Sequence, residues 1–176
     1  MVQAITGWIE RRIGRRALRR ADQWRSLLER SREEDADWDW SSILWEFAEL
    51  QRLGKGAYVG FTLWALDDVQ ALLLMEVGGA KYPGVADGSP QGYLEYLAVA
   101  PQNRGTIQEP RLLRGCGTVL LEAAMHESYR RGWKGRVSLH SLPGSLVFYR
   151  RQGFRDYGPD PHEGGCHYLE RSGTLS

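Results

Sequence analysis

The sequence predicts a single α/β domain, residues 1–176, built on a mixed and mostly antiparallel sheet with helices on both faces. First, a chain of 176 residues that is 42% hydrophobic can bury one ordinary core. Second, helical periodicity dominates residues 1–53, whereas strand-like apolar runs dominate residues 57–172. Third, a strand-turn-helix-strand unit in the second half makes the fold mixed rather than purely antiparallel.

The helical part of the chain carries two predicted helices. Residues 2–9 are compatible with either a first strand or the lead into a helix. Apolar residues recur at helical spacing over 15–34, opposite an arginine-rich side, and again over 40–53, where Ser41 or Ser42 can cap the helix.

The rest of the chain alternates strands with turn signals. Apolar runs at 57–66 and 69–78 flank Asp67-Asp68, which favours an antiparallel hairpin. A long loop rich in Pro and Gly leads to the next strand, which Pro101 ends. The further elements, in order, are a strand at 93–101, a helix from 116, a strand at 136–142, a short helix at 145–153, and strands at 154–158 and 166–172.

Charge and cysteine content restrict the partners. A formal net charge of +1 gives no general reason to expect nucleic acid or a membrane as the main partner. Cys116 and Cys166 are too few for a disulfide scaffold and lack zinc-ligand spacing. No apolar run approaches the roughly 20 residues that span a bilayer. We therefore expect a soluble cytoplasmic protein, a monomer or homodimer, without a metal or a membrane partner.

The segment RLLRGCGTVLLEAAMHES, residues 111–128, changes from a basic turn to an amphipathic helix. Gly115 and Gly117 allow the backbone to approach a ligand closely, and the first amides of the helix lack partners within it. With the helix dipole and Arg114, these amides suit a phosphate-like anion. The alternative is a tight strand-to-helix turn without a ligand. Dinucleotide and P-loop motifs both fit badly, because Leu120 replaces a third glycine and no Gly-Lys-Ser/Thr follows.

Three stretches together resemble the acyl-CoA-binding core of the Gcn5-related N-acetyltransferases (GNAT). These are YLAVAP, RGCGTVLLEAA and RVSLHSLPGSLVFYRRQGF, the last of which contains a Tyr-x-x-x-Gly-Phe signature at Tyr149, Gly153 and Phe154. The resemblance is specific from Tyr93 to Gly158 and only organisational before that. It implies the GNAT fold, with 1–53 contributing to the acceptor side.

The resemblance also implies how an acyl-CoA would bind. Its pyrophosphate would lie on the backbone amides of the glycine turn, here Arg114, Gly115, Cys116, Gly117 and Thr118. Its pantetheine arm would pair like an added strand with the end of the preceding strand, here Leu97, Ala98 and Val99. The strand at 136–142 would diverge to admit this arm. Two departures are Leu112, where the family usually has Gln or Arg, and a segment at 102–114 that is longer than the usual link. Arg111 and Arg114 flank Leu112 and could substitute for the family residue.

An alkylamine has a pKa near 10.4 and is therefore mostly protonated at neutral pH. A base must remove a proton before the amine can attack the thioester. Tyr149 matches the family tyrosine that donates to the departing sulfur; the alternative is a core aromatic residue. Glu95 is the candidate base, because it should share a strand face with Leu97, Val99 and Tyr93; the alternative is an ion-paired strand residue. His140 is either a proton relay or a structural histidine. Cys116 at a helix start suggests a nucleophile, but the family uses only its backbone.

The implied activity is transfer of an acyl group, by default acetyl, from acetyl-CoA or another acyl-CoA to a primary amine of a small molecule, peptide or protein. The alternative is a non-catalytic module of the same fold that senses acyl-CoA or binds RNA. An RNA partner is the less favoured of these. The feature behind it is an arginine cluster that would contact RNA phosphates, whereas an acidic cluster interleaved with tryptophans would hold a cationic peptide or polyamine. The alternative for both clusters is a solvated, internally paired surface with core tryptophans. Their residues are Arg11, Arg12, Arg15, Arg16, Arg19, Arg20, Glu33, Glu34, Asp35, Asp37, Asp39, Trp38, Trp40 and Trp45.

Overall fold

The structure, a computed structural model, describes Glu49 and residues 58–66, 68–78, 84–85, 87–107 and 109–172. Glu49 is helical. The other elements and clusters predicted for residues 1–53 lie outside the described residues.

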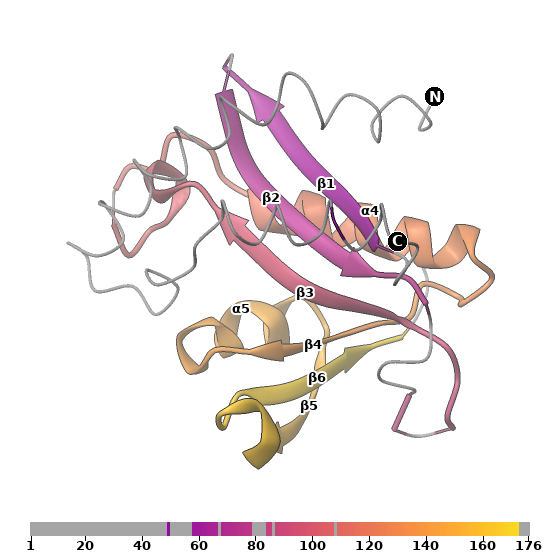
Figure 1. The fold of residues 1–176 in the computed structure, drawn as a ribbon. Helices are drawn as coiled ribbons and strands as arrows, with labels where there is room; N and C mark the ends of the chain where they lie inside the picture. Colours follow the sequence, from indigo (N-terminus) through magenta and orange to yellow (C-terminus); the bar gives the residue numbers. More distant parts are fainter. Residues whose placement is uncertain are drawn as a thin grey trace.

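The described strands form one six-stranded sheet in the order β1-β2-β3-β4-β6-β5 (Figure 1). Neighbouring strands are antiparallel except for β3 and β4, which are parallel. The sheet is therefore mixed and mostly antiparallel, as predicted. Each strand begins and ends within two residues of its predicted bounds: β1 Tyr58–Ala65, β2 Asp68–Glu76, β3 Gly92–Val99, β4 Val137–Ser141, β5 Arg155–Pro159 and β6 His167–Arg171.

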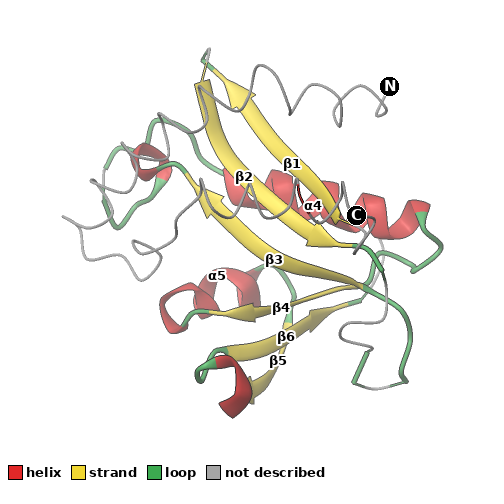
Figure 2. Cartoon of the chain, viewed as in Figure 1, coloured by secondary structure: helices red, strands yellow, loops and turns green. Residues whose placement is uncertain are grey.

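Two helices, α4 (Cys116–Arg130) and α5 (Leu146–Arg151), share one face of this sheet, and α4 lies behind β1, β2 and β3 in Figure 2. Both helices pack in one core cluster with alternate residues of the strands. The cluster contains Leu121 of α4, Tyr149 of α5 and Leu139 of β4. The opposite face of β2 and β3 carries a second apolar cluster. The helices expected over that face fall within 1–53.

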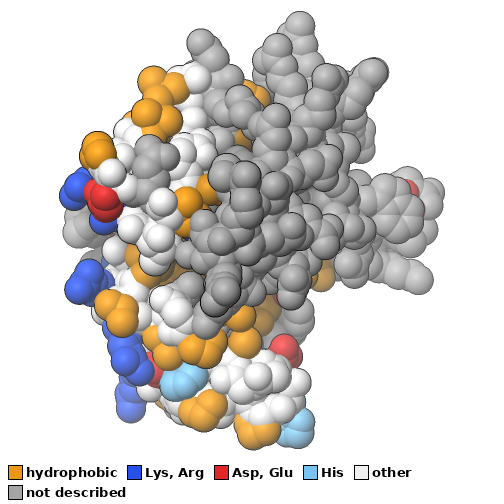
Figure 3. Space-filling view, turned by 90° about the vertical axis from the view of Figure 1, so that its left-hand side faces the viewer, with side chains coloured by type: hydrophobic (Ala, Val, Ile, Leu, Met, Phe, Trp, Pro, Cys, Tyr) orange, Lys and Arg blue, Asp and Glu red, His pale blue; other side chains and the backbone are white. Residues whose placement is uncertain are grey.

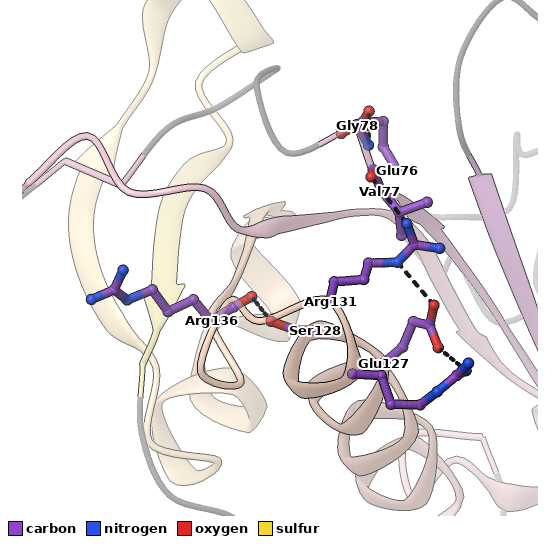
Figure 4. Close-up of polar contacts among 8 residues, drawn as sticks. Glu76, Val77, Gly78, Glu127, Ser128, Arg131 and Arg136 are labelled. Atoms are coloured by element: carbon purple, nitrogen blue, oxygen red, sulfur yellow. Dashed lines mark hydrogen bonds and ion pairs between the residues drawn. The ribbon is translucent and has the colours of Figure 1, made fainter.

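The C-terminal end of α4 is fixed by charged side chains (Figure 4). Glu127, which is 7% exposed, accepts hydrogen bonds from Arg130 at 2.7 Å and from Arg131 at 2.9 Å. Arg131 also reaches the Val77 carbonyl, and the Ser128 hydroxyl donates to the Arg136 carbonyl at 2.7 Å. These contacts connect α4 to the end of β2 and to the residue before β4, so they fix where β4 begins.

A bulge in β3 changes which side chains share a face. The register with β2 passes from Leu94 to Tyr96 and leaves Glu95 without an opposing residue. Leu94 and Leu97 consequently pack in the same core cluster, although they are three positions apart. Tyr93 lies on the other face, where its hydroxyl contacts His140. The predicted common face of Tyr93 with Leu97 and Val99 is therefore wrong, because a regular alternation was assumed across the bulge.

Candidate functional site

The parallel pair β3 and β4 separates partway along its length. Only the first residues pair, and the last pair is Leu94 with Leu139, while β3 continues to Val99. This divergence is the one that the family resemblance implied. It leaves the second half of β3 with an open edge on the side of β4.

Alternation along β3 decides which backbone groups face the open edge. The Ala100 N–H donates to the Gln70 carbonyl of β2 at 2.9 Å. Backbone groups two residues apart point the same way, so those of Ala98 face β2 and those of Leu97 and Val99 face the opening. Ala98 is also buried, at 1% exposure. Of the three positions expected to pair with a pantetheine arm, Leu97 and Val99 face the open edge, where the Val99 carbonyl already accepts a hydrogen bond from Arg104 Nε at 2.7 Å.

A pocket of about 620 Å³ lies at this opening. Leu97 and Val99 line it from β3, the turn residues Gly115 to Thr118 from the start of α4, and Phe148 and Tyr149 from α5. The pocket therefore brings together the strand edge, the glycine turn and the tyrosine that the sequence singled out separately.

The start of α4 has the geometry of an anion site. Gly115 adopts φ +78°, a left-handed conformation that favours glycine, and no side chain caps the helix. The Val119 N–H donates to the Gly115 carbonyl at 3.0 Å, so the preceding amides, those of Cys116, Gly117 and Thr118, are the first amides of the helix, which have no partner within it. These amides and the helix dipole together attract negative charge.

Gly117 is needed for space as well. A Cβ atom there would lie 3.0 Å from Phe148 Cζ and 3.5 Å from Val99 Cγ2. A larger side chain at this position would therefore press against α5 and the open edge of β3.

Among the residues that the structure describes, the charged ones that line the pocket are all arginines: Arg104 and Arg111 from the 102–114 segment and Arg151 from α5. Arg114 is not part of the lining; its side chain is 72% exposed and lies 3.6 Å from Glu109. A hydrogen bond from Arg111 lowers the pKa of Glu109. Figure 3 views the side of the molecule that holds this segment and α5, and basic side chains follow one border of the described surface there.

Tyr149 is 8% exposed and is fixed by its aromatic neighbours. Its ring meets Phe148 and Phe154 edge to face, with centroids 5.1 Å and 5.5 Å apart. The Phe154 N–H donates to the Tyr149 carbonyl at 3.1 Å where the chain leaves α5. The side chain is thus both a core aromatic residue and part of the pocket wall.

Glu95 occupies the bulge and is partly buried, but it does not line the pocket. Cys116 lines the pocket, but its side chain is only 4% exposed, and burial raises the pKa of its thiol. A protonated thiol is a poor nucleophile, which favours the backbone role expected for Cys116.

A polar chain lies on the sheet face opposite α4, beside the point where β3 and β4 separate. The Tyr93 hydroxyl is 2.8 Å from His140 Nδ1, and His140 Nε2 is 3.2 Å from Asp160 Oδ2. The His162 amide, and then His140, lower the pKa of Asp160. The sequence suggested His140 but neither partner, because Asp160 comes from an irregular turn and Tyr93 was assigned to the wrong face.

Within the described part of the chain, no helix is long and apolar enough to cross a membrane. The same residues hold no group of three or more His, Cys, Asp or Glu side chains placed to bind a metal ion.

The sheet order, the single parallel pair that opens, and the glycine turn at its mouth constitute the fold of the GNAT N-acetyltransferases, and solved structures match it over most of the chain. PaiA N-acetyltransferase from Thermoplasma acidophilum, in complex with coenzyme A, is 14% identical, with a TM-score of 0.54 over 88% of this chain and 87% of that one. The Bacillus subtilis N-acetyltransferase YlbP, also in complex with coenzyme A, is 17% identical, with a TM-score of 0.51 over 77% and 84%. A protein from Desulfovibrio desulfuricans, described as an acetyltransferase of the GNAT family, is 18% identical, with a TM-score of 0.53 over 84% and 90%.

Neither a protein-family model nor a curated protein sequence matches the chain. The likeness to these structures is therefore one of fold.

Proposed function

We propose that this protein is an acyl-CoA-dependent N-acyltransferase. It transfers an acyl group, acetyl by default, to a primary amine of a small molecule, peptide or protein. The observation that carries the proposal is that the open edge of β3 and the uncapped start of α4 meet in one pocket of about 620 Å³. Two structures of the same fold contain coenzyme A, which supports the choice of ligand.

In this proposal the pyrophosphate of the acyl-CoA binds the backbone of the turn, at Arg114, Gly115, Cys116, Gly117 and Thr118. The pantetheine arm runs along β3 and hydrogen-bonds the backbone of Leu97 and the N–H of Val99, since the Val99 carbonyl already accepts from Arg104 Nε. Ala98 contributes no hydrogen bond, because its backbone groups face β2.

The reaction joins the amine nitrogen to the thioester carbonyl carbon and breaks the carbon–sulfur bond. Glu95 takes the proton that the amine loses, directly or through water, and Tyr149 donates its hydroxyl proton to the departing sulfur. Glu95 then releases its proton to solvent and Tyr149 regains one, so the products are an amide and free CoA thiol.

Thermal unfolding with and without ligand tests the proposal. A ligand at 100 times its dissociation constant stabilises the protein by about 2.7 kcal/mol, which corresponds to roughly 5 to 10 °C for a domain of this size. We expect such a shift with CoA and acetyl-CoA, and a long-chain acyl-CoA measured alongside ranks the acyl groups. Gly117→Glu should abolish the shift, because it fills the space between Val99 and Phe148 and adds negative charge at the anion site.

Val85→Glu is the matched control, because it adds the same charge at a residue that is 58% exposed and outside this pocket. It should keep the full shift. No shift with any thioester would contradict the proposal. A shift without CoA release in a screen of amines would instead favour a module that senses acyl-CoA. Affinity for RNA that falls with added salt would favour the RNA-binding alternative.

A further inference from the structure

We infer that the arginine loop, residues 104–107 and 109–112, recognises the 3′-phosphate of coenzyme A and makes the site selective for CoA over 3′-dephospho-CoA. The inference rests on the proposed function and defines its ligand more closely. CoA carries negative charge at two places, the pyrophosphate and the 3′-phosphate monoester on the ribose. The first amides of α4 account for the pyrophosphate only.

Buried amide side chains fix the base of the arginine loop. Asn103, 6% exposed, donates from Nδ2 to Gln70 Oε1 at 2.8 Å, and Gln70 is 1% exposed. Asn103 Oδ1 accepts the Leu113 N–H at 2.9 Å. One side chain thus holds the residues on both sides of the loop together and ties them to β2. A loop fixed in this way presents its arginines without a large entropic cost on binding.

The loop directs two arginines into the pocket. Arg104 and Arg111 line it beside Gly115 and Gly117, and no acidic residue of the described ranges lines it. Arg104 Nε donates to the Val99 carbonyl at 2.7 Å, which fixes the guanidinium at the end of the open edge of β3. Arg111 Nε lies over Gly105, where a Cβ atom would come within 3.0 Å of it.

A carboxylate, that of Glu109, lies between Arg111 and Arg114. Glu109 Oε1 accepts from Arg111 Nε at 2.9 Å, and Glu109 Oε2 lies 3.6 Å from Arg114. The two oxygens of one anion therefore bridge a pocket arginine and the first residue of the glycine turn. A phosphate monoester presents the same kind of acceptor with greater charge, so it can replace the carboxylate between the two guanidinium groups.

Binding of CoA and of 3′-dephospho-CoA, measured by titration calorimetry on the wild type and two variants, tests the inference. The wild type should bind CoA about tenfold or more tightly than 3′-dephospho-CoA. The reason is that a hydrogen bond to a charged group contributes a binding free energy that corresponds to about this change in Kd. Arg111→Gln should weaken CoA binding about tenfold and leave the binding of 3′-dephospho-CoA nearly unchanged. Arg130→Gln, at the other end of α4, should behave as the wild type.

Two results would overturn the inference while the proposed function stands. The first is equal affinity of the wild type for both ligands. The second is an Arg111→Gln variant that weakens both ligands equally, since this would place Arg111 at the pyrophosphate. A wild type that binds neither ligand would overturn the proposed function itself. The Arg111 side chain is 37% exposed, so the melting temperature of the ligand-free variant should stay near that of the wild type, which confirms that it folds.

Discussion

The hydroxyl of Tyr149 is the most accessible test of catalysis at the scale of single residues. Tyr149→Phe keeps the ring between Phe148 and Phe154, so the fold and the pocket should persist. If the hydroxyl protonates the leaving sulfur, kcat should fall about 100-fold or more, while the affinity for acyl-CoA changes little. Steady-state CoA release and the thermal shift measure the two quantities separately. Turnover at the wild-type rate would remove Tyr149 as the acid.

Glu95 is tested by the pH dependence of the reaction. The ionisation of an essential base gives the ascending limb of the profile of kcat/KM against pH. Glu95→Gln should lower kcat/KM about 100-fold and remove that limb. Glu95→Gln keeps the size and shape of the side chain, and the melting temperature of the variant, measured alongside, checks that it folds. Full activity in this variant would contradict Glu95 as the base and favour a proton relay through His140, which contacts Tyr93 and Asp160.

Predictability from the sequence differs among the site residues for physical reasons. Gly115 and Gly117 were identifiable because two glycines at a helix start indicate either an anion site or a tight turn. The structure places both glycines in the pocket. Arg104 was missed as a pocket residue because an irregular loop has no periodicity that reveals where its side chains point, whereas Arg111 was considered as a substitute for the family residue at position 112. The buried Gln70, in an otherwise apolar strand, was the available signal for the anchor that positions them.

At the scale of elements, alternation and turn residues located every described strand but not the irregularities within them. Both register shifts of the first three strands place a polar residue at the extra position, Glu95 on β3 and Gln70 on β2. A bulge reverses the phase of the side chains after it, so a pattern of period two cannot show which face each half of a strand presents. This is why the existence of β3 was predictable and the face of Tyr93 was not.

The anchor of the arginine loop gives a prediction for that element. Asn103→Ala removes one donor to the buried Gln70 and the acceptor of the Leu113 N–H. The free energy of unfolding should fall by about 1–3 kcal/mol, and CoA affinity should fall with it because the loop loses its fixed base. Gln102→Ala is the control, since it leaves the backbone carbonyl that accepts the Leu112 N–H, and it should change both quantities little. An Asn103→Ala variant with wild-type stability would contradict the anchor.

At the scale of the whole molecule, the sheet has a central strand, β4, that pairs on both sides, and the pocket lies where β3 and β4 separate. β4 pairs with β6 along its full length and with β3 at its start, whereas β1 has a partner on one side only within the described sheet. The covered faces also differ, because α4 and α5 pack on one face and a separate apolar cluster occupies the other. The strand order followed from no local pattern, because non-local pairing is decided by packing. The resemblance to GNAT proteins supplied only the divergence of the strand at 136–142 from the one before it.

This arrangement predicts which backbone amides exchange their hydrogens more slowly when CoA binds. Amides of β4 should exchange only through global unfolding, so CoA at 100 times its dissociation constant should slow them about 100-fold, although β4 lies beyond the direct contacts of the phosphates. The amides of Cys116, Gly117 and Thr118 should slow through direct contact, and frayed amides of β1 should not change. Gly117→Glu should lose both effects together. Protection of the turn without any slowing in β4 would mean that β4 opens locally, and that the binding energy at the turn does not stabilise the sheet as one cooperative unit.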